Sequence, residues 1–153
     1  MEIGPDHALR LDQQICFPLY AASNLMTRLY RPLLTELRLT YPQYLVMLVL
    51  WETSPIRMGE LCQRLYLDSG TLTPLLKRLA SAGYVSRERD PGDERRVVLA
   101  LTPAGLALKQ RALSVPIALA SQFDGAPEQV TAFRIALQNV TQDLAEKVAA
   151  LSG

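Results

Sequence analysis

The chain has few of the residues that build metal sites and disulfide frameworks. Its 153 residues include two cysteines, Cys16 and Cys62, and a single histidine, His7. These three residues are scattered along the sequence, so they form no metal-ligand cluster, and we expect no metal or other cofactor. In a reducing compartment, which the next observations favour, a structural disulfide is not expected either.

The sequence also lacks a long apolar run. No stretch approaches the ~20 residues that a membrane-spanning helix needs. The first residues, 1–6, have neither the basic start nor the apolar core of a secretory signal. We therefore expect a cytoplasmic protein with no membrane partner.

The sequence also has no large excess of positive or negative charge. The net charge is only +1, from 16 basic and 15 acidic residues, whereas a pI above ~9 is the usual sign of a nucleic-acid-binding domain. From Arg57 to Arg96 the sequence holds eight basic and six acidic residues, a small excess. Any case for DNA binding must therefore rest on where the charges lie.

What the sequence does contain is helical periodicity at both ends of one domain, residues 1–153. Residues 7–37 repeat apolar side chains at steps of three and four, with a bend expected near 14–18 because Pro18 interrupts the pattern. Residues 102–122 predict another helix, and residues 128–151 a last one. That last helix has a narrow apolar seam, typical of packing against another helix, which we expect in a partner subunit: Val130, Phe133, Leu137, Val140, Leu144, Val148 and Leu151.

The middle of the chain changes pattern. Helices are expected over 43–52, with Thr40 as its cap, over 57–65 and over 71–82, followed by Gly83 at the position after the helix. Pro74 leaves two starts open for the third helix, one at Thr73 and one at 68–69. Two strands, 84–89 and 96–101, then flank a charged turn. The predicted fold is mainly α with a small β-hairpin wing: a winged helix-turn-helix over about 42–101, dimerised by helices within 7–37 and 103–151.

This arrangement predicts which side chains would meet DNA. The leucines of the second helix share one face and leave the hydroxyl and basic side chains on the other. An arginine at the wing tip could enter a minor groove, with Asp93 orienting it as a salt-bridge partner. A charged hairpin tip is otherwise often only a solvated turn. The candidate DNA-binding residues are Ser69, Thr71, Thr73, Lys77, Arg78, Asp93, Arg95 and Arg96.

Several segments together resemble the MarR family of repressors, over nearly the whole chain. The matching segments are LDSGTLTPLLKRL at 67–79, GYV at 83–85, DERRV at 93–97 and LTPAG at 101–105. The resemblance implies a homodimer that binds double-stranded operator DNA. It also implies a transcriptional regulator rather than an enzyme.

A narrower resemblance is to the organic hydroperoxide-sensing subgroup, the OhrR proteins. The segments LDQQICFPLY at 11–20, YRPLL at 30–34 and LTYPQY at 39–44 carry it. The resemblance implies that Cys16 is the redox sensor and that Tyr30 and Tyr41 hydrogen-bond it. Some members carry a second, resolving cysteine in the C-terminal half, but residues 63–153 contain none. This departure implies the one-cysteine type, in which a low-molecular-weight thiol caps the oxidised cysteine.

Helix geometry constrains that sensor. Tyr30 lies 14 positions after Cys16, or ~21 Å along a straight helix, which is too far for a hydrogen bond. Tyr30 must therefore reach Cys16 from the other subunit or around a sharp bend, and the resemblance implies the former. Organic peroxide would convert the thiolate to a sulfenic acid, which can condense with a thiol. Cys62 lies among leucines and is interpreted as a core residue.

Three alternatives remain open at this stage. A MarR-type repressor can instead be released by a small phenolic ligand bound between the helical and winged regions. A thiol peroxidase using Cys16 is the second alternative, although no βαβ pattern, CxxC motif or resolving cysteine supports it. A helical interaction module that does not bind DNA would leave the wing arginines without a purpose.

Overall fold

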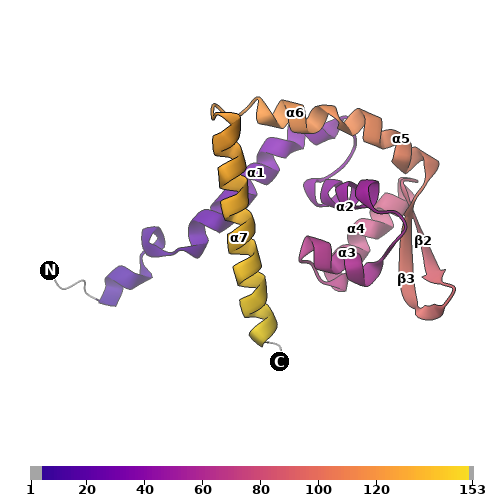
Figure 1. The fold of residues 1–153 in the computed structure, drawn as a ribbon, viewed down its shortest axis with the longest axis horizontal. Helices are drawn as coiled ribbons and strands as arrows, with labels where there is room; N and C mark the ends of the chain where they lie inside the picture. The colour runs from indigo at the N-terminus through magenta and orange to yellow at the C-terminus, as the bar shows by residue number, and fades with distance from the viewer. Residues whose placement is uncertain (1–4, 152–153) are drawn as a thin grey trace.

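Helices make up most of the chain, and one small sheet joins them. The structure, a computed structural model, describes residues 5–151. After two 3-10 turns, Pro5–Leu9 and Leu11–Gln13, the elements follow in the order drawn in Figure 1. They are α1 Cys16–Thr35, α2 Tyr41–Glu52, β1 Ile56–Arg57, α3 Met58–Leu65, α4 Ser69–Ser81, β2 Val85–Asp90, β3 Asp93–Leu101, α5 Pro103–Ala112, α6 Ser114–Ala120 and α7 Pro127–Leu151. The predicted mainly α fold with a hairpin wing is confirmed.

The core lies among α2, α3, α4 and the sheet. Helix α2 is apolar all round and is buried on most sides, as expected for a central helix. Its start is fixed by Thr40, whose hydroxyl accepts the amide N–H of Gln43 at 3.4 Å while the Gln43 side chain accepts the Thr40 N–H at 2.9 Å. The largest fully buried side chains are Leu34, Met47, Leu50, Leu61, Leu72, Leu76, Leu79 and Leu99.

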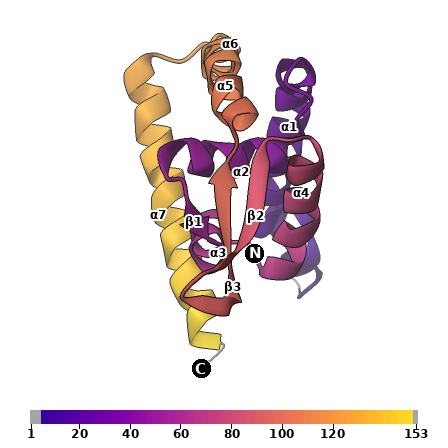
Figure 2. The same ribbon diagram turned by 90° about the vertical axis from the view of Figure 1, so that its right-hand side faces the viewer.

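The sheet has three strands in the order β1-β3-β2, and both pairings are antiparallel. Figure 2 shows the β2–β3 hairpin extending below α3 and α4, with β1 on the opposite side of β3 from β2. Strand β1 was not predicted, because two residues are too few to show an alternating pattern. Its register pairs Ile56 with Leu99 and Arg57 with Val98.

Two predicted helices have different boundaries from those expected. Residues 7–37 do not form one bent helix: the chain leaves its 3-10 turns at Gln14 and α1 begins at Cys16. Pro18 therefore lies in the first turn of α1, where the missing N–H breaks no helical bond. Residues 102–122 form two helices, since Pro116 cannot donate to the carbonyl of Ala112, where α5 ends.

Helix α4 begins at Ser69, so the earlier of its two predicted starts is correct. Asp68 caps it by accepting the amide N–H of Thr71 at 2.8 Å. Pro74 thus lies inside the helix. After its last turn Gly83 has φ of +82°, the left-handed conformation expected of a glycine in this position. The second helix of the helix-turn-helix is therefore one continuous helix of 13 residues.

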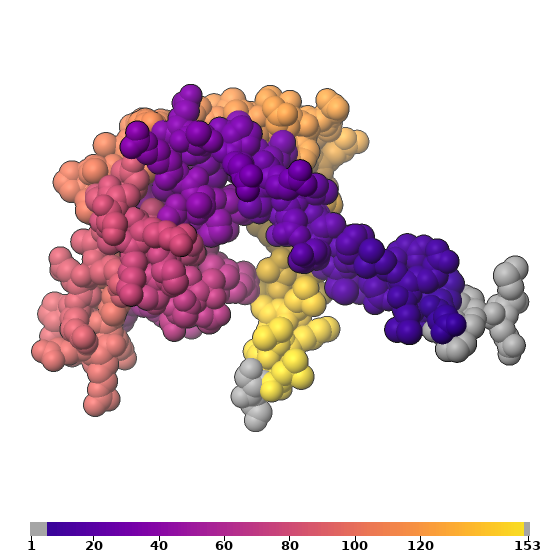
Figure 3. All heavy atoms as spheres, turned by 180° about the vertical axis from the view of Figure 1, so that it is seen from behind, coloured from indigo at the N-terminus to yellow at the C-terminus, as the bar shows by residue number. Residues whose placement is uncertain are grey.

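The terminal segments stand away from this core. In Figure 1, α5 and α6 run along the top of the molecule and α7 descends from their end. Figure 3, from behind, shows the segment before α1 projecting to one side and α7 separated from the helix-turn-helix by an opening. The chain thus places its first and last helices where a second molecule can reach them.

Candidate nucleic-acid interface and redox site

Helix α4 presents a polar outer face because its leucines face inward. Leu72, Leu76 and Leu79 are fully buried, whereas the predicted DNA-binding side chains lie on the outside. Ser69, Thr71, Lys77 and Arg78 are exposed and Thr73 is half-buried. The arrangement offers two cations and several hydroxyls from one rigid element.

Two of these hydroxyls already donate within the protein. The Thr71 hydroxyl donates to Asp68 at 3.0 Å, and the Thr73 hydroxyl donates to the Ser69 carbonyl at 2.7 Å. Their oxygens are left as acceptors. In this conformation they suit a base amino group better than a phosphate, which has only acceptors. The two hydrogen bonds from Thr71, the backbone one foremost, also hold the pKa of Asp68 below its usual value.

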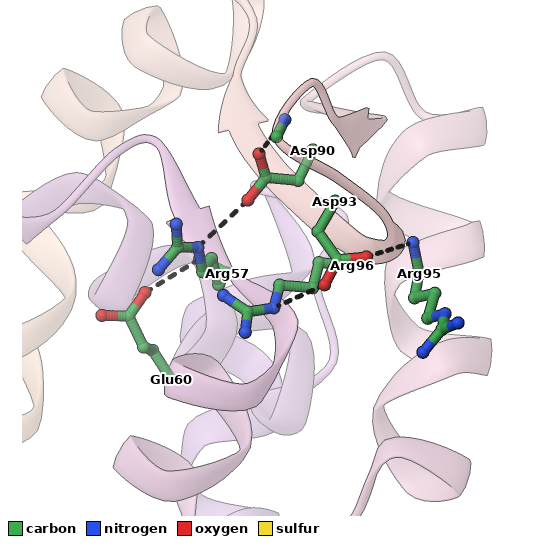
Figure 4. Close-up of polar contacts among 7 residues, drawn as sticks. Arg57, Glu60, Asp90, Asp93, Arg95 and Arg96 are labelled. Atoms are coloured by element: carbon green, nitrogen blue, oxygen red, sulfur yellow. Dashed lines mark hydrogen bonds and ion pairs between the residues drawn. The ribbon is translucent and has the colours of Figure 1, made fainter.

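The wing tip is held by hydrogen bonds and an ion pair between residues close in sequence. Asp93 accepts the backbone N–H of Arg95 at 3.1 Å and pairs with the Arg96 guanidinium at 3.3 Å. Arg89 donates to the Glu94 carbonyl at 2.6 Å. Asp93 therefore orients the side chain of Arg96, but it contacts only the backbone of Arg95. The salt-bridge partner expected for Asp93 at the wing tip is thus Arg96. The Arg95 side chain is exposed and points away from this group, and within residues 5–151 it makes no ion pair (Figure 4).

Sequence reasoning missed a second ion pair, which joins β1 to the outer end of the wing. Arg57, on β1, donates from Nε to Asp90, at the end of β2, at 3.2 Å (Figure 4). The two residues are 33 positions apart, and no spacing in the sequence indicates that they meet. Asp90 also accepts the Gly92 N–H at 2.9 Å. These two partners, the Gly92 amide foremost, hold the pKa of Asp90 below its usual value.

Cys16 is the first residue of α1 and is exposed. Tyr30 lies on the same uninterrupted helix, so the straight-helix separation of ~21 Å applies within one chain. Residues 5–151 of one protomer therefore do not bring Cys16 to Tyr30. Ile15, which is 90 % exposed, and Phe17 surround Cys16 with apolar surface.

The two predicted sensor tyrosines, in contrast, lie together. The rings of Tyr30 and Tyr41 have centroids 4.5 Å apart, and Tyr44 lies 5.8 Å from Tyr30. Burial and the neighbouring phenols raise the pKa of Tyr30 to about 12, and burial raises the pKa of Tyr41. Both phenols therefore stay protonated at neutral pH and keep a proton to donate.

Cys62 has a different setting. It is half-buried on α3 and packs against the core beside Leu61, which is fully buried. Cys62 was expected to be a core residue, and the structure places it at the edge of the core with part of its side chain exposed. No group of three or more histidine, cysteine or acidic side chains that could hold a metal occurs among residues 5–151. None of the described helices is long and apolar enough to cross a membrane.

Large apolar side chains are exposed on α1, α6 and α7. Ile117 is 72 % exposed and Phe133 65 %. The predicted seam of α7 is exposed along its length, as are Leu19, Tyr20 and Leu25 of α1. A patch this extended on a single protomer marks an interaction surface.

Comparison with known proteins identifies the family. The family model of the transcriptional regulators SarA/Rot matches residues 28–112. The organic hydroperoxide resistance transcriptional regulator of Bacillus subtilis is 42 % identical over 147 residues, which cover 96 % of this chain and 99 % of the relative. The chain belongs to the MarR family of transcriptional regulators.

Other members of the MarR family are similarly related. The HTH-type transcriptional regulator TtmR of Methylorubrum extorquens is 51 % identical over 75 % of this chain, a match that spans 59 % of TtmR. Among solved structures, reduced AbfR bound to DNA, from Staphylococcus epidermidis, has a TM-score of 0.77 and 34 % identity, covering 92 % of this chain and 96 % of that one. Disulfide-formed AbfR is 34 % identical over 94 % and 95 % of the two chains and has a TM-score of 0.60.

Proposed function

We propose that the protein is a homodimeric repressor that binds operator DNA when Cys16 is reduced and releases it when an organic hydroperoxide oxidises Cys16. One observation carries this proposal: the chain is 42 % identical, over almost its full length, to an organic hydroperoxide resistance regulator, and it has an exposed cysteine at the start of its first long helix. An operator-binding protein works where the chromosome is, so we place it in the cytoplasm.

The DNA-binding part of the proposal rests on α4 and the wing. Helix α4 would lie in the major groove with Thr71, Thr73 and Lys77 toward base edges, and Ser69 and Arg78 toward phosphates. The wing would carry Arg95 into the adjacent minor groove, with Asp93 and Arg96 fixing the tip. The relative AbfR has been solved bound to DNA in its reduced form, and the present chain has the same fold.

The sensor would be completed by the second protomer. Because α1 keeps Cys16 and Tyr30 of one chain apart, the phenols of Tyr30 and Tyr41 would reach Cys16 of the other chain across the dimer interface. Phenol donors favour the thiolate, which is the nucleophile. The thiolate sulfur attacks the peroxide, the O–O bond breaks, and a sulfenic acid and an alcohol form. A low-molecular-weight thiol then condenses with the sulfenic acid, forming a mixed disulfide and water.

Release of the operator would follow from strain at the interface. A group added at Cys16 has to fit between apolar helices of both protomers, so it would shift the two halves. Dimeric helix-turn-helix proteins contact half-sites about 10 bp apart, so a modest rotation of the recognition helices costs affinity. The relative AbfR has been solved reduced on DNA and with a disulfide formed, and the two structures differ in how well they match this chain, with TM-scores of 0.77 and 0.60.

The alternative of a ligand-released repressor has less support. The relative that is 42 % identical over almost the full length is an organic hydroperoxide resistance regulator, which favours thiol oxidation as the trigger. The PcaV regulator of Streptomyces coelicolor, solved with its natural ligand, is 24 % identical and shares the fold alone.

The test is operator binding, by fluorescence anisotropy, to DNA from upstream of the protein's own gene, with and without cumene hydroperoxide. Wild type, Cys16→Ser and Cys62→Ser are compared, the last as a matched cysteine control. We expect the reduced forms of all three to bind and only Cys16→Ser to stay bound after peroxide. Release of Cys16→Ser would overturn the sensor assignment, and failure of every reduced form to bind would overturn the repressor assignment.

A further inference from the structure

We propose that Arg57 and Asp90 form a strap that positions the wing for DNA, so that Arg57 is a positioning residue for operator binding. The inference rests on the proposed function, because it assumes that the wing contacts the operator. It begins from the sheet. Strand β3 lies between β1 and β2, so the Arg57–Asp90 ion pair at 3.2 Å crosses the central strand and joins the two edge strands.

The sheet register explains how the two side chains meet. Arg57 pairs with Val98, and Val98 also pairs with Glu88. Arg57 and Glu88 therefore lie in one row across the sheet, on the same face, with Asp90 two residues further along β2. The register shift between Arg89 and Asp90 falls at this point. A long arginine side chain can thus span β3 and reach the carboxylate.

Each residue of the strap is also held by a hydrogen bond to its own part of the fold. The backbone N–H of Arg57 donates to Glu60 at 3.2 Å, at the start of α3, and α3 packs against the core through the fully buried Leu61. Asp90 holds the turn through the Gly92 N–H at 2.9 Å. Figure 4 shows the continuous path from Glu60 through Arg57 to Asp90. The path connects the first helix of the helix-turn-helix to the turn that precedes Arg95.

The outer part of the wing needs such a connection because its residues 87–89 and 94–96 are exposed, whereas the buried Val85 and Leu99 lie at its inner end. Strand β1 pairs with β3 at only two positions, Ile56 and Arg57, and beyond them β2 and β3 contact mainly one another. An open cleft of about 460 Å³ lies between the start of α3 and the wing, and it is lined in part by Arg57, Arg95 and Arg96. Without the strap the hairpin could pivot across this cleft and carry Arg95 away from a groove aligned with α4.

Direct contact of Arg57 with a DNA phosphate is the competing explanation. The two explanations predict opposite changes in operator affinity for one variant, Asp90→Asn. Asp90→Asn removes a negative charge near DNA, so electrostatics alone would tighten binding. Asparagine can still accept the Gly92 N–H, so the turn is kept. If the strap positions the wing, Asp90→Asn instead weakens binding, although it removes an acidic group.

The experiment measures operator affinity of wild type, Arg57→Gln, Asp90→Asn and the double variant by fluorescence anisotropy. Glu52→Gln is the matched control, since Glu52 of α2 also pairs with an arginine of another element, Arg64 of α3, and neither residue belongs to the wing. We expect each single variant to bind about fivefold more weakly, the double variant no worse than either, and the control unchanged or slightly tighter. Equal or tighter binding by Asp90→Asn would overturn the proposal.

A second readout separates positioning from a general loss of stability. In the Arg57→Gln background, adding Arg95→Ala should cost clearly less affinity than it does in wild type, because Arg95 is no longer aimed. Full additivity of the two losses would contradict the strap. Thermal unfolding by circular dichroism, which shows whether each variant is folded at the assay temperature, accompanies both measurements.

A third readout needs no DNA, so it keeps the strap testable if the proposed function fails. Hydrogen–deuterium exchange in the free protein reports opening of the wing over residues 90–97. We expect faster exchange there in both Arg57→Gln and Asp90→Asn and no change in Glu52→Gln. Unchanged exchange in the two strap variants would overturn the proposal, whereas wild-type protein that binds no operator would overturn only the proposed function.

Discussion

Tyr30 and Tyr41 pack ring against ring, with centroids 4.5 Å apart, although one lies on α1 and the other begins α2. This contact places two protonated phenols at one point on the protomer surface. The Cys16 of the same chain is a helix length away. Under the proposed function these phenols would receive the sulfur atom of a second chain, so replacing the tyrosines tests the sensor.

Replacing both tyrosines by phenylalanine should slow oxidation of Cys16. Tyr30→Phe with Tyr41→Phe removes the donors to the thiolate and keeps the ring packing, so we expect a rate with cumene hydroperoxide about tenfold lower, the effect of roughly 1.4 kcal/mol. The rate is measured by thiol labelling and mass spectrometry. Tyr66→Phe, at a residue 60 % exposed on the helix-turn-helix, is the control. An unchanged rate in the double variant would remove the tyrosines from the sensor.

Tyr30 also predicts a loss of stability in alkali. Its pKa is about 12 in the folded protein against an ordinary value of 10. Below pH 10 the phenol is protonated in both states, whereas between pH 10 and 12 only the unfolded state loses the proton. The free energy of unfolding should therefore fall as pH rises through this range. Urea titrations at pH 9, 10 and 11 measure the slope, which Tyr30→Phe should flatten; an equal slope in that variant would contradict the shifted pKa.

Arg95 should account for a large part of operator affinity. We expect Arg95→Ala to weaken binding about tenfold or more, since a groove contact by arginine is worth roughly 1–3 kcal/mol. Lys147→Ala, which removes a basic residue of α7, serves as the charge-matched control. Anisotropy titrations at a single fixed salt concentration compare the two. Equal, small losses in both variants would mean that the wing contributes only general positive charge.

Gly105 should tolerate no side chain. A Cβ built there would overlap the carbonyl oxygen of Tyr84, a backbone atom that cannot move aside easily. The Gly105 carbonyl also accepts the indole N–H of Trp51 at 2.9 Å, which fixes α5 against α2. We expect Gly105→Ala to lower the free energy of unfolding by about 1–3 kcal/mol or more.

A matched glycine on another helix gives the control for that experiment. Gly59 of α3 has nothing within 4 Å of a built Cβ, so Gly59→Ala should be stabilising by about 0.5–1 kcal/mol. Urea denaturation measures both variants, and the fluorescence of Trp51 provides the signal. Similar stability of the two alanine variants would show that the close approach of α5 to Tyr84 is not a constraint.

The sequence predicted those parts of the fold that depend on local chemistry. The cap at Thr40, the glycine at the end of α4 and the hairpin after it are each set by residues within a few positions. The break at Leu113, between α5 and α6, was missed because helix periodicity continues through it. Strand β1 was missed because its pairing is with residues more than forty positions away.

The same distinction applies to the candidate sites. The polar face of α4 follows from the spacing of its leucines and could be predicted from the sequence. The Arg57–Asp90 pair depends on two edge strands meeting across a third, which no local pattern encodes. The contact proposed for Cys16 depends on a second protomer, so neither the sequence nor one chain's structure contains both sides of it.

The most direct test of the central claim follows oxidation and release together in Cys62→Ser, which leaves Cys16 as the single thiol. Operator-bound protein is treated with a small excess of cumene hydroperoxide and a low-molecular-weight thiol, and samples are divided between anisotropy and intact-mass measurement. The account predicts that the fraction of operator released rises in step with the fraction of Cys16 carrying the thiol adduct. Release that is complete while Cys16 remains unmodified would contradict it.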